Sequence, residues 1–229
     1  RFVALWAWRA RRQGLTAVLS NHEQFGALAA ALLAERMGWP GTPVNAVLAC
    51  QHKLYARSVL QRVCPDANPG FGRLDAAYGA DVPDDLSYPL FIKPVKAAFS
   101  VLARTVHSRA DLHAHTRFGP WELWVIRHLV EPFERVMRER LPEAGTAHSL
   151  MFEEPVHAPQ YCLDGYVLEG QLHRLGVVDV AMYVIDFPLI VTVNLSPTSI
   201  VPPMASVSTC AIAGESPRQI FVAIFHIPV

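Results

Sequence analysis

The sequence has 229 residues, of which 52% are hydrophobic and 17% are charged, and its 20 basic and 20 acidic residues cancel. This length and apolar content predict a globular protein with a substantial core and exclude an intrinsically disordered chain. The formal net charge of zero gives no indication of a nucleic acid or an anionic membrane as a partner. No apolar run reaches the roughly 18 residues of a transmembrane helix, so no membrane span is predicted.

The cysteines are widely spaced and include no C-x-x-C pair, and no histidine stands at zinc-finger spacing from them. We interpret them as small core residues in a reducing compartment, which favours a cytoplasmic location. They are Cys50, Cys64, Cys162 and Cys210. Because the sequence begins with Arg1 rather than methionine, we expect the natural N-terminus to lie upstream.

The first 42 residues predict two helices separated by a short strand. The first helix covers Phe2–Arg12, and the strand covers Thr16–Leu19. Ser20 followed by Glu23 has the spacing of a capping box, which predicts the start of a helix that continues to Met37. Strand, cap and helix in this order are half of a βαβ-type unit.

The next region is predicted to be a helix followed by a loop. The helix spans Pro43–Val63 and carries Lys53 and Arg57 on one face, which favours a solvated surface. The loop spans Gly70–Asp85, where turn-forming residues are frequent. Two further helices are predicted downstream, at Ser108–Thr116 and Trp121–Leu141.

The stretch Tyr88–Val106 places a lysine within an apolar context. Leu90–Ile92 predicts a short buried strand, and Lys93 follows directly. A lysine at the end of a buried strand is costly unless an anion meets it, and the small residues from Ala97 to Ser100 would let a loop approach a phosphate closely. The alternative is an ordinary hairpin whose Lys93 side chain reaches solvent.

A second polar stretch follows the apolar strand that begins at Leu150. Glu153 and Glu154 are adjacent, so they point to opposite faces of a strand and do not form a glycosidase pair. A further strand is predicted at Leu172–Tyr183. From Phe187 onward prolines are frequent and charges are rare, which marks residues 187–229 as an atypical segment.

Together these segments resemble the ATP-grasp superfamily of ATP-dependent carboxylate–amine/thiol ligases. The resemblance covers roughly residues 15–183 and rests on the order of its motifs rather than on any single one. The motifs are Ser20-Asn-His-Glu-Gln-Phe-Gly26, Gly-Trp-Pro-Gly-Thr-Pro, Gln51-His-Lys53-Leu-Tyr-Ala-Arg57, Phe91-Ile-Lys-Pro94 with Phe99-Ser100, and Phe152-Glu-Glu-Pro-Val with Leu163-Asp-Gly.

The resemblance implies an α+β fold in which two α+β subdomains clasp ATP, preceded by a partial Rossmann-like unit. The expected regions are a partial pre-ATP-grasp unit at 1–42, a nucleotide-binding region at 43–186, and an atypical or truncated C-terminal segment at 187–229. The chain is expected to be truncated at both ends relative to such ligases.

The resemblance also implies the nucleotide contacts. Lys53 would approach the phosphates, Lys93 would contact the α-phosphate and the adenine edge, and the Ala97–Ser100 loop would cover the phosphates with its backbone N–H groups. Glu153 would accept a hydrogen bond from the adenine amino group. Three further contacts are implied. Glu154 is the carboxylate next to Glu153, Val156 would hydrogen-bond adenine through its backbone, and the Gln160 side-chain amide would contact the ribose.

Ligases of this superfamily form an acylphosphate from a carboxylate and ATP, which an amine or thiol attacks, with Mg²⁺ neutralising the phosphoryl charge. Phe225-His-Ile-Pro228 resembles the first magnesium motif but has Pro228 in place of the metal carboxylate, and no Glu-x-Asn motif is present. We therefore expect an ATP-binding, ligase-like protein that lacks Mg²⁺ ligands and is catalytically impaired. The alternatives are a non-catalytic interaction module on this fold, and a segment after Asp186 that is read out of frame.

Overall fold

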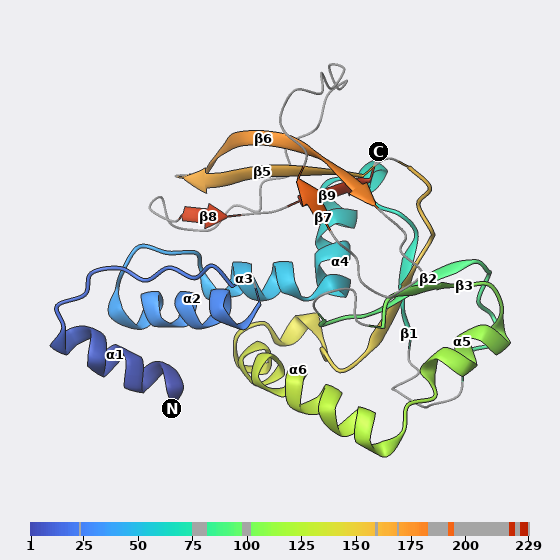
Figure 1. The fold of residues 1–229 in the computed structure, drawn as a ribbon, viewed down its shortest axis with the longest axis horizontal. Helices are drawn as coiled ribbons and strands as arrows, with labels where there is room; N and C mark the ends of the chain where they lie inside the picture. Colours follow the sequence, from blue (N-terminus) through green and yellow to red (C-terminus); the bar gives the residue numbers. More distant parts are fainter. Residues whose placement is uncertain are drawn as a thin grey trace. The chain divides into compact units, whose positions relative to one another are not determined.

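The computed structural model describes residues 1–22, 24–74, 82–97, 102–158, 160–168, 170–182, 192–194, 220–222 and 225–228 (Figure 1). The chain divides into two compact units, one of Arg1–Val47 with Ala158–Val229 and one of Leu48–His157. Both contain helices and antiparallel strands, so the predicted α+β class is confirmed. This division does not test the expected regions 1–42, 43–186 and 187–229, which stay predictions.

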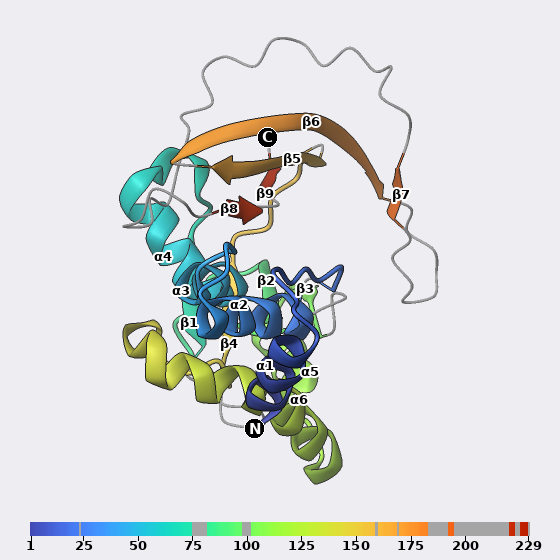
Figure 2. The same ribbon diagram turned by 90° about the vertical axis from the view of Figure 1, so that its left-hand side faces the viewer.

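The unit that contains both chain ends has helices at its start and a sheet at its end. Helix α1 covers Phe2–Arg12, as predicted, and α2 covers Phe25–Met37, which ends where predicted. The sheet has the order β7-β6-β5-β8, and β9 also pairs with β5. Figure 2 shows β5 and β6 side by side, as their antiparallel register requires. The strands are β5 (Gln160–Leu168), β6 (Gln171–Met182), β7 (Thr192–Asn194), β8 (Ile220–Val222) and β9 (Phe225–Pro228).

Two local predictions in this unit are wrong. Residues 15–20 form no strand, so the strand predicted at Thr16–Leu19 is absent from the described ranges of this segment. Helix α2 begins after Gln24 rather than at Ser20, because the Ser20 hydroxyl is used in a local turn: its Oγ accepts from the His22 N–H and donates to the His22 carbonyl. Glu23, the other half of the expected capping box, lies outside the described residues.

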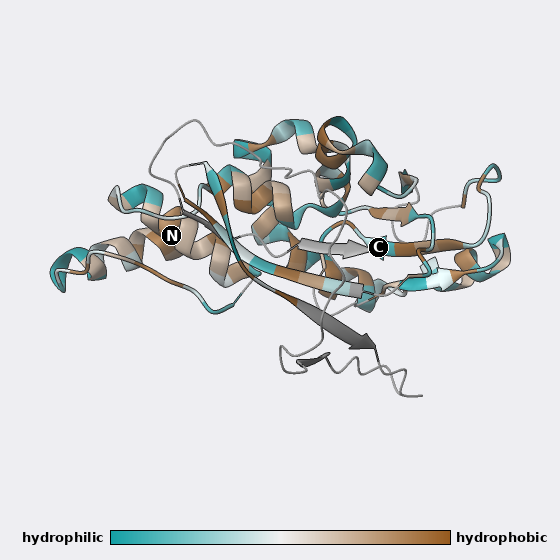
Figure 3. Ribbon diagram, turned by 90° about the horizontal axis from the view of Figure 1, so that it is seen from above, coloured by the Kyte–Doolittle hydropathy of each residue, from teal (hydrophilic) through white to brown (hydrophobic). Residues whose placement is uncertain are grey.

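The second unit, Leu48–His157, is built on a four-stranded antiparallel sheet with the order β1-β4-β2-β3. Helices precede the sheet and connect its strands, and Figure 3 shows brown and teal segments mixed along the helices. In the described ranges no helix combines the length and the apolarity needed to cross a bilayer. Helix α3 (Val44–Gln51) crosses from the first unit into this one. The other elements are α4 (Lys53–Val63), β1 (Phe71–Leu74), β2 (Leu90–Pro94), β3 (Arg104–Val106), α5 (Arg109–Thr116), α6 (Pro120–Arg140) and β4 (Leu150–Glu153).

This unit confirms the later helices and corrects the earlier ones. Helix α5 begins as predicted, with the Ser108 hydroxyl accepting from the Asp111 N–H. The single helix predicted over Pro43–Val63 is instead two helices, α3 and α4, which are separated at the extended residue His52. The region predicted to be a loop, Gly70–Asp85, contains strand β1. The sequence did not predict this strand because four residues are too few to show a clear alternating pattern.

The two faces of the sheet differ in character. In β2, Leu90 and Ile92 are buried and alternate with the half-buried Phe91 and Lys93. The first face packs into one apolar core, which also contains Phe152 at its edge. The other members of this core are Leu74, Val82, Val106, Leu112 and Leu150, with Leu86 and Tyr88 packed against them. The opposite face carries Lys93 and Glu153 beside the half-buried Phe91 and the fully buried Met151.

Gly72 gives a direct test of how tightly β1 and β4 pack. Gly72 and Phe152 are register partners, and a Cβ at residue 72 would overlap the Phe152 ring. We expect Gly72→Ala to lower the free energy of unfolding by about 1–3 kcal/mol, as overpacking does. At Gly70 a Cβ would meet only the flexible Glu154 carboxylate, at 2.6 Å. Urea denaturation should therefore show a clearly smaller loss for Gly70→Ala, and equal losses would contradict this account.

Candidate nucleotide-binding site

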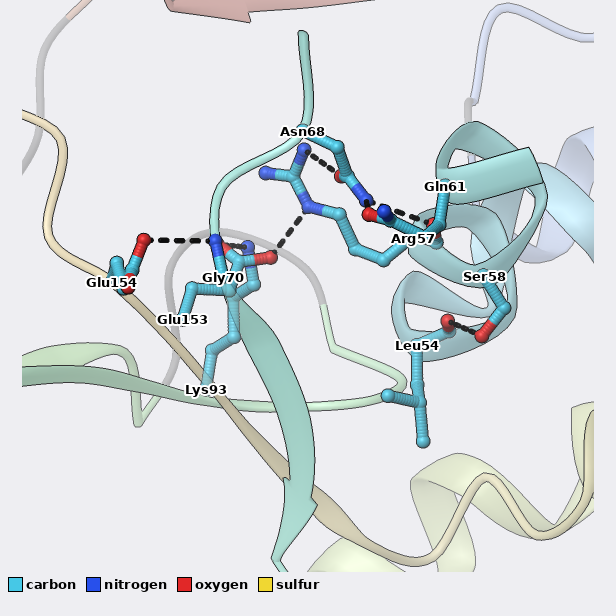
Figure 4. Close-up of polar contacts among 9 residues, drawn as sticks. All are labelled: Leu54, Arg57, Ser58, Gln61, Asn68, Gly70, Lys93, Glu153 and Glu154. Atoms are coloured by element: carbon cyan, nitrogen blue, oxygen red, sulfur yellow. Dashed lines mark hydrogen bonds and ion pairs between the residues drawn. The ribbon is translucent and has the colours of Figure 1, made fainter. Parts of the chain in front are cut away.

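On the face of this sheet opposite to the apolar core, a carboxylate is held by two cations (Figure 4). Lys93 Nζ lies 2.6 Å from Glu153 Oε2, and Arg57 Nε lies 2.8 Å from Glu153 Oε1. The exposed fractions of the three side chains are 17% for Lys93, 18% for Arg57 and 7% for Glu153. The alternative in which Lys93 reaches into solvent is therefore wrong, and so is the interpretation of Arg57 as a solvated surface residue.

Strand register brings Lys93 and Glu153 together. Strands β2 and β4 pair so that Phe91 is opposite Glu153 and Lys93 is opposite Met151. Lys93 and Glu153 are thus diagonal neighbours on one face, close enough for a long side chain to reach across. The Lys93 ammonium also lies 5.7 Å from the centre of the Phe91 ring. The alternation of the strand, and not only the local sequence, aims this lysine at the carboxylate.

Burial and charge act in opposite directions on this trio. Burial lowers the pKa of Lys93, and the neighbouring Glu153 only partly restores it. Burial raises the pKa of Glu153, but the hydrogen bond from Arg57 and the charge of Lys93 outweigh it, so the net pKa lies below its usual value. Two cations against one carboxylate leave one positive charge within the trio, which suits an anionic ligand such as a phosphate.

Arg57 is the residue of this site that the sequence analysis missed. Its Nη1 donates to Asn68 Oδ1 at 3.2 Å, and Asn68 Nδ2 donates to the Arg57 carbonyl at 3.1 Å and to Gln61 Oε1 at 2.9 Å. This network fixes the guanidinium against Glu153. The only sequence signal was its place four residues after Lys53 on one helix face, a spacing that solvated residues share.

Lys53, the first residue of α4, is attached to the segment that follows β2. Its Nζ donates to the Ala97 carbonyl at 2.8 Å, and its backbone N–H donates to the Val95 carbonyl at 3.1 Å. Next to it, the buried Lys96 donates from Nζ to Gln51 Oε1 at 2.8 Å. The structure therefore brings Lys53 and Ala97 together, at the start of the loop expected to cover the phosphates. Ser100, also expected there, lies outside the described residues.

Glu154 lies apart from the trio, as the opposite directions of adjacent strand residues require. Its Oε2 accepts from the Gly70 N–H at 3.0 Å, and its own N–H donates to the Gly70 carbonyl at 2.8 Å. The side chain thus ties the end of β4 to the start of β1. Val156 follows β4 in an exposed position. Gln160 begins β5 in the other unit, and its side chain lies outside what the structure describes.

The described residues show no group of side chains suited to Mg²⁺. Within the described part of the chain, no three His, Cys, Asp or Glu side chains are grouped to hold a metal ion. Residues Phe225–Pro228 form β9, in which Pro228 pairs with Gln160. A proline offers no carboxylate at the position that the resemblance gives to a metal ligand. The residue types in the described ranges therefore do not fit Mg²⁺.

Comparison with known proteins shows similarity in structure but not in sequence. No family model matches the chain, and no curated protein sequence matches it. An L-amino acid ligase from Bacillus licheniformis aligns over 78% of this chain and 36% of its own, with a TM-score of 0.55 and 19% identity. The D-Ala:D-Ser ligase VanG from Enterococcus faecalis aligns over 75% and 46%, with a TM-score of 0.50 and 17% identity.

A third similar structure contains a bound nucleotide. The biotin carboxylase domain of a 2-oxoglutarate carboxylase from Hydrogenobacter thermophilus, in complex with MgADP, ADP and bicarbonate, aligns over 79% of this chain and 38% of its own. Its TM-score is 0.51 and its identity is 16%. This chain thus spans less than half the length of the three solved enzymes. Their shared architecture identifies the fold of this chain as the ATP-grasp fold.

Proposed function

We propose that the Leu48–His157 unit binds ATP through the sheet face that carries Lys93 and Glu153. In this proposal Lys53 and Lys93 meet the phosphates, and Glu153 accepts from the adenine amino group. The observation that carries it is the 2.6 Å ion pair between Lys93 and Glu153 on one face of the sheet. It places a cation that can bind a phosphate next to a carboxylate that can accept a hydrogen bond from an amine. The ADP complex of the structurally similar carboxylase domain supports the choice of ligand.

Glu153 has the capacity for this role although both oxygens already have partners. A carboxylate offers about four lone-pair positions, and the two cations use one on each oxygen. The carboxylate is held in one orientation by Arg57, so an incoming exocyclic amine meets a fixed acceptor. In the same proposal Val156 adds a backbone hydrogen bond to adenine, Glu154 borders this contact, and the Ala97–Ser100 loop contributes backbone N–H groups. The ribose contact expected of Gln160 stays a prediction.

The proposed reaction class is that of a carboxylate–amine or carboxylate–thiol ligase, with catalysis impaired in this chain. Bound ATP supplies the phosphoryl group from which such ligases make an acylphosphate. The solved ligases of this fold that join amino acids support this class. Pro228 on β9 supports the impairment, because it removes the carboxylate expected to hold Mg²⁺. A cytoplasmic location remains part of the proposal.

Titration of ATP and of adenosine, compared by calorimetry, tests the phosphate role of Lys53. We expect Lys53→Ala to weaken ATP binding about 10- to 100-fold and to leave adenosine binding unchanged, since a hydrogen bond from a charged donor contributes about 1.5–3 kcal/mol. Arg62→Ala is the control, because Arg62 is an exposed cation on the same helix. Equal losses for both ligands would contradict the phosphate role.

The competing function is an interaction module that does not bind nucleotide. It predicts a thermal unfolding temperature of the intact chain that ATP does not raise, because only ligand binding to the folded state stabilises it. A rise in the unfolding temperature that grows with ATP concentration would exclude this module.

A further inference from the structure

His52 separates α3 from α4 and is the residue that starts the helix carrying Lys53. Its backbone is extended, with φ −91° and ψ 91°, and its side chain is fully buried. Its Nδ1 accepts from the Tyr55 N–H at 3.1 Å, so the imidazole is the N-cap of α4. The ring also meets the Tyr55 ring edge to face, with centroids 6.5 Å apart.

The residues on both sides of this cap are attached to the segment after β2. Before His52, Gln51 Oε1 accepts from Lys96 Nζ, and after it, Lys53 bonds to Val95 and Ala97. The turn at residue 52 therefore sets where α4 starts and in which direction the Lys53 side chain leaves the helix. If the cap opened, the first turn of α4 would lose a backbone partner and Lys53 would no longer be held at the Ala97 carbonyl.

The cap depends on the protonation state of the imidazole. Nδ1 accepts a hydrogen bond only when its proton is absent, so the ring must be neutral with its proton on Nε2. An imidazolium donates from both nitrogens and would face the Tyr55 N–H with another N–H. Nε2 is buried and makes no hydrogen bond of standard geometry within the described residues, although the Thr146 carbonyl lies near enough to favour a proton on the ring. The acceptor role of Nδ1 is therefore the feature that requires the neutral form.

Burial lowers the pKa of His52, while the Thr146 carbonyl and the Glu134 carboxylate oppose this shift and Lys53 reinforces it. Glu134, on α6, is itself engaged by the Ala147 N–H at 2.7 Å and by Arg138 Nε at 3.4 Å. The cap consequently persists to a lower pH than an ordinary histidine, whose pKa is 6.5, would allow.

We propose that His52 is a positioning residue for the phosphate-binding Lys53, and that its protonation opens the α4 cap and weakens nucleotide binding at acidic pH. This inference rests on the proposed ATP site. The affinity for phosphate would then depend on pH through His52, a residue that directly precedes Lys53 and is not exposed to solvent.

The test is a calorimetric ATP titration of the full chain at a series of pH values from about 8 to about 5. His52→Asn keeps a cap acceptor that cannot be protonated, and His52→Leu removes the acceptor. We expect the wild type to lose about five- to tenfold in affinity relative to His52→Asn in the acidic part of the series, and to match it at high pH. His52→Leu should be weaker than both at high pH. Because the ligand titrates identically in all three experiments, only differences between variants count. If the ATP affinities of the wild type and of His52→Asn change in parallel over the whole pH series, the proposal is overturned.

A second measurement is independent of ATP and covers the case in which a variant fails to fold. Imidazole nitrogen NMR of the wild type should show the Nε2–H tautomer of His52 at neutral pH, and the Lys53 amide should exchange slowly until His52 is protonated. An Nδ1–H tautomer, or Lys53 exchange that ignores this protonation, overturns the positioning role. If these signals behave as expected but ATP does not bind, the proposed function fails while the coupling between His52 and Lys53 holds.

Discussion

Lys93→Ala is expected to cause a severe loss of ATP affinity. The substitution removes a cation that is only 17% exposed and that the proposal places against the α-phosphate. Removing one partner of a buried, hydrogen-bonded charge pair costs about 2–5 kcal/mol, or roughly 30- to 5,000-fold in affinity. It also leaves Glu153 with Arg57 alone, so the adenine acceptor loses one of the two groups that orient it. Both effects weaken binding, and calorimetric titration measures their sum.

Arg109→Ala is the matched control for this experiment. It removes the same charge from the same unit, but Arg109 pairs with Asp84, and both side chains are more than half exposed. Such a surface pair contributes little, so ATP affinity should remain within about twofold of the wild type. If Lys93→Ala binds ATP as tightly as Arg109→Ala does, Lys93 is not a phosphate ligand and the site is wrongly placed.

Glu153→Gln is expected to destabilise the fold and to weaken binding. The variant leaves Lys93 and Arg57 facing an uncharged amide, and breaking a buried ion pair in this way costs several kcal/mol. Because both cations keep some contact with solvent, we expect a loss of about 2–4 kcal/mol in the free energy of unfolding. Glu154→Gln is the control, since Glu154 accepts from a backbone N–H and not from the two cations. Urea denaturation at neutral pH should separate the two variants clearly.

The same residue predicts a pH dependence. The pKa of Glu153 is lower in the folded chain than its ordinary value of 4.5. The stabilisation is therefore complete above about pH 4.5 and is lost as the pH falls through the folded-state pKa. Wild-type stability should decline in this acid range more steeply than that of Glu153→Gln, which has no carboxyl at this position to titrate. Parallel declines would show that Glu153 does not contribute through its charge.

Much of the fold follows from local patterns. The apolar run Leu90–Ile92 predicted β2, the capping signal at Ser108 predicted α5, and the extended amphipathic pattern predicted α6. The break at His52 was not predicted, because histidine is an uncommon N-cap and the sequence on both sides continues a helical pattern. The strand expected at Thr16–Leu19 did not form, since short apolar runs are ambiguous without knowledge of a pairing partner.

The candidate site was less accessible to local reasoning than the fold. Lys93 and Glu153 are 60 positions apart, and Arg57 and Glu153 are 96 apart. No spacing rule connects residues at such distances, so the resemblance to ATP-grasp ligases, and not periodicity, identified Lys93 and Glu153 as partners of one ligand. Arg57 was missed because its partner lies on a strand that is remote in sequence. The same three-dimensional pairing explains why a lysine can stand in a half-buried strand.

The most direct test of the central claim is a calorimetric titration of ATP into the full 229-residue chain, with and without Mg²⁺. We predict saturable binding of one ATP per chain with a Kd in the micromolar range, which corresponds to a binding free energy of about −8 kcal/mol. Mg²⁺ should increase the affinity only slightly. That result would establish a nucleotide site that does not depend on a protein-bound metal. Absence of binding to a chain whose circular dichroism shows it to be folded would leave the fold intact and contradict the proposed function.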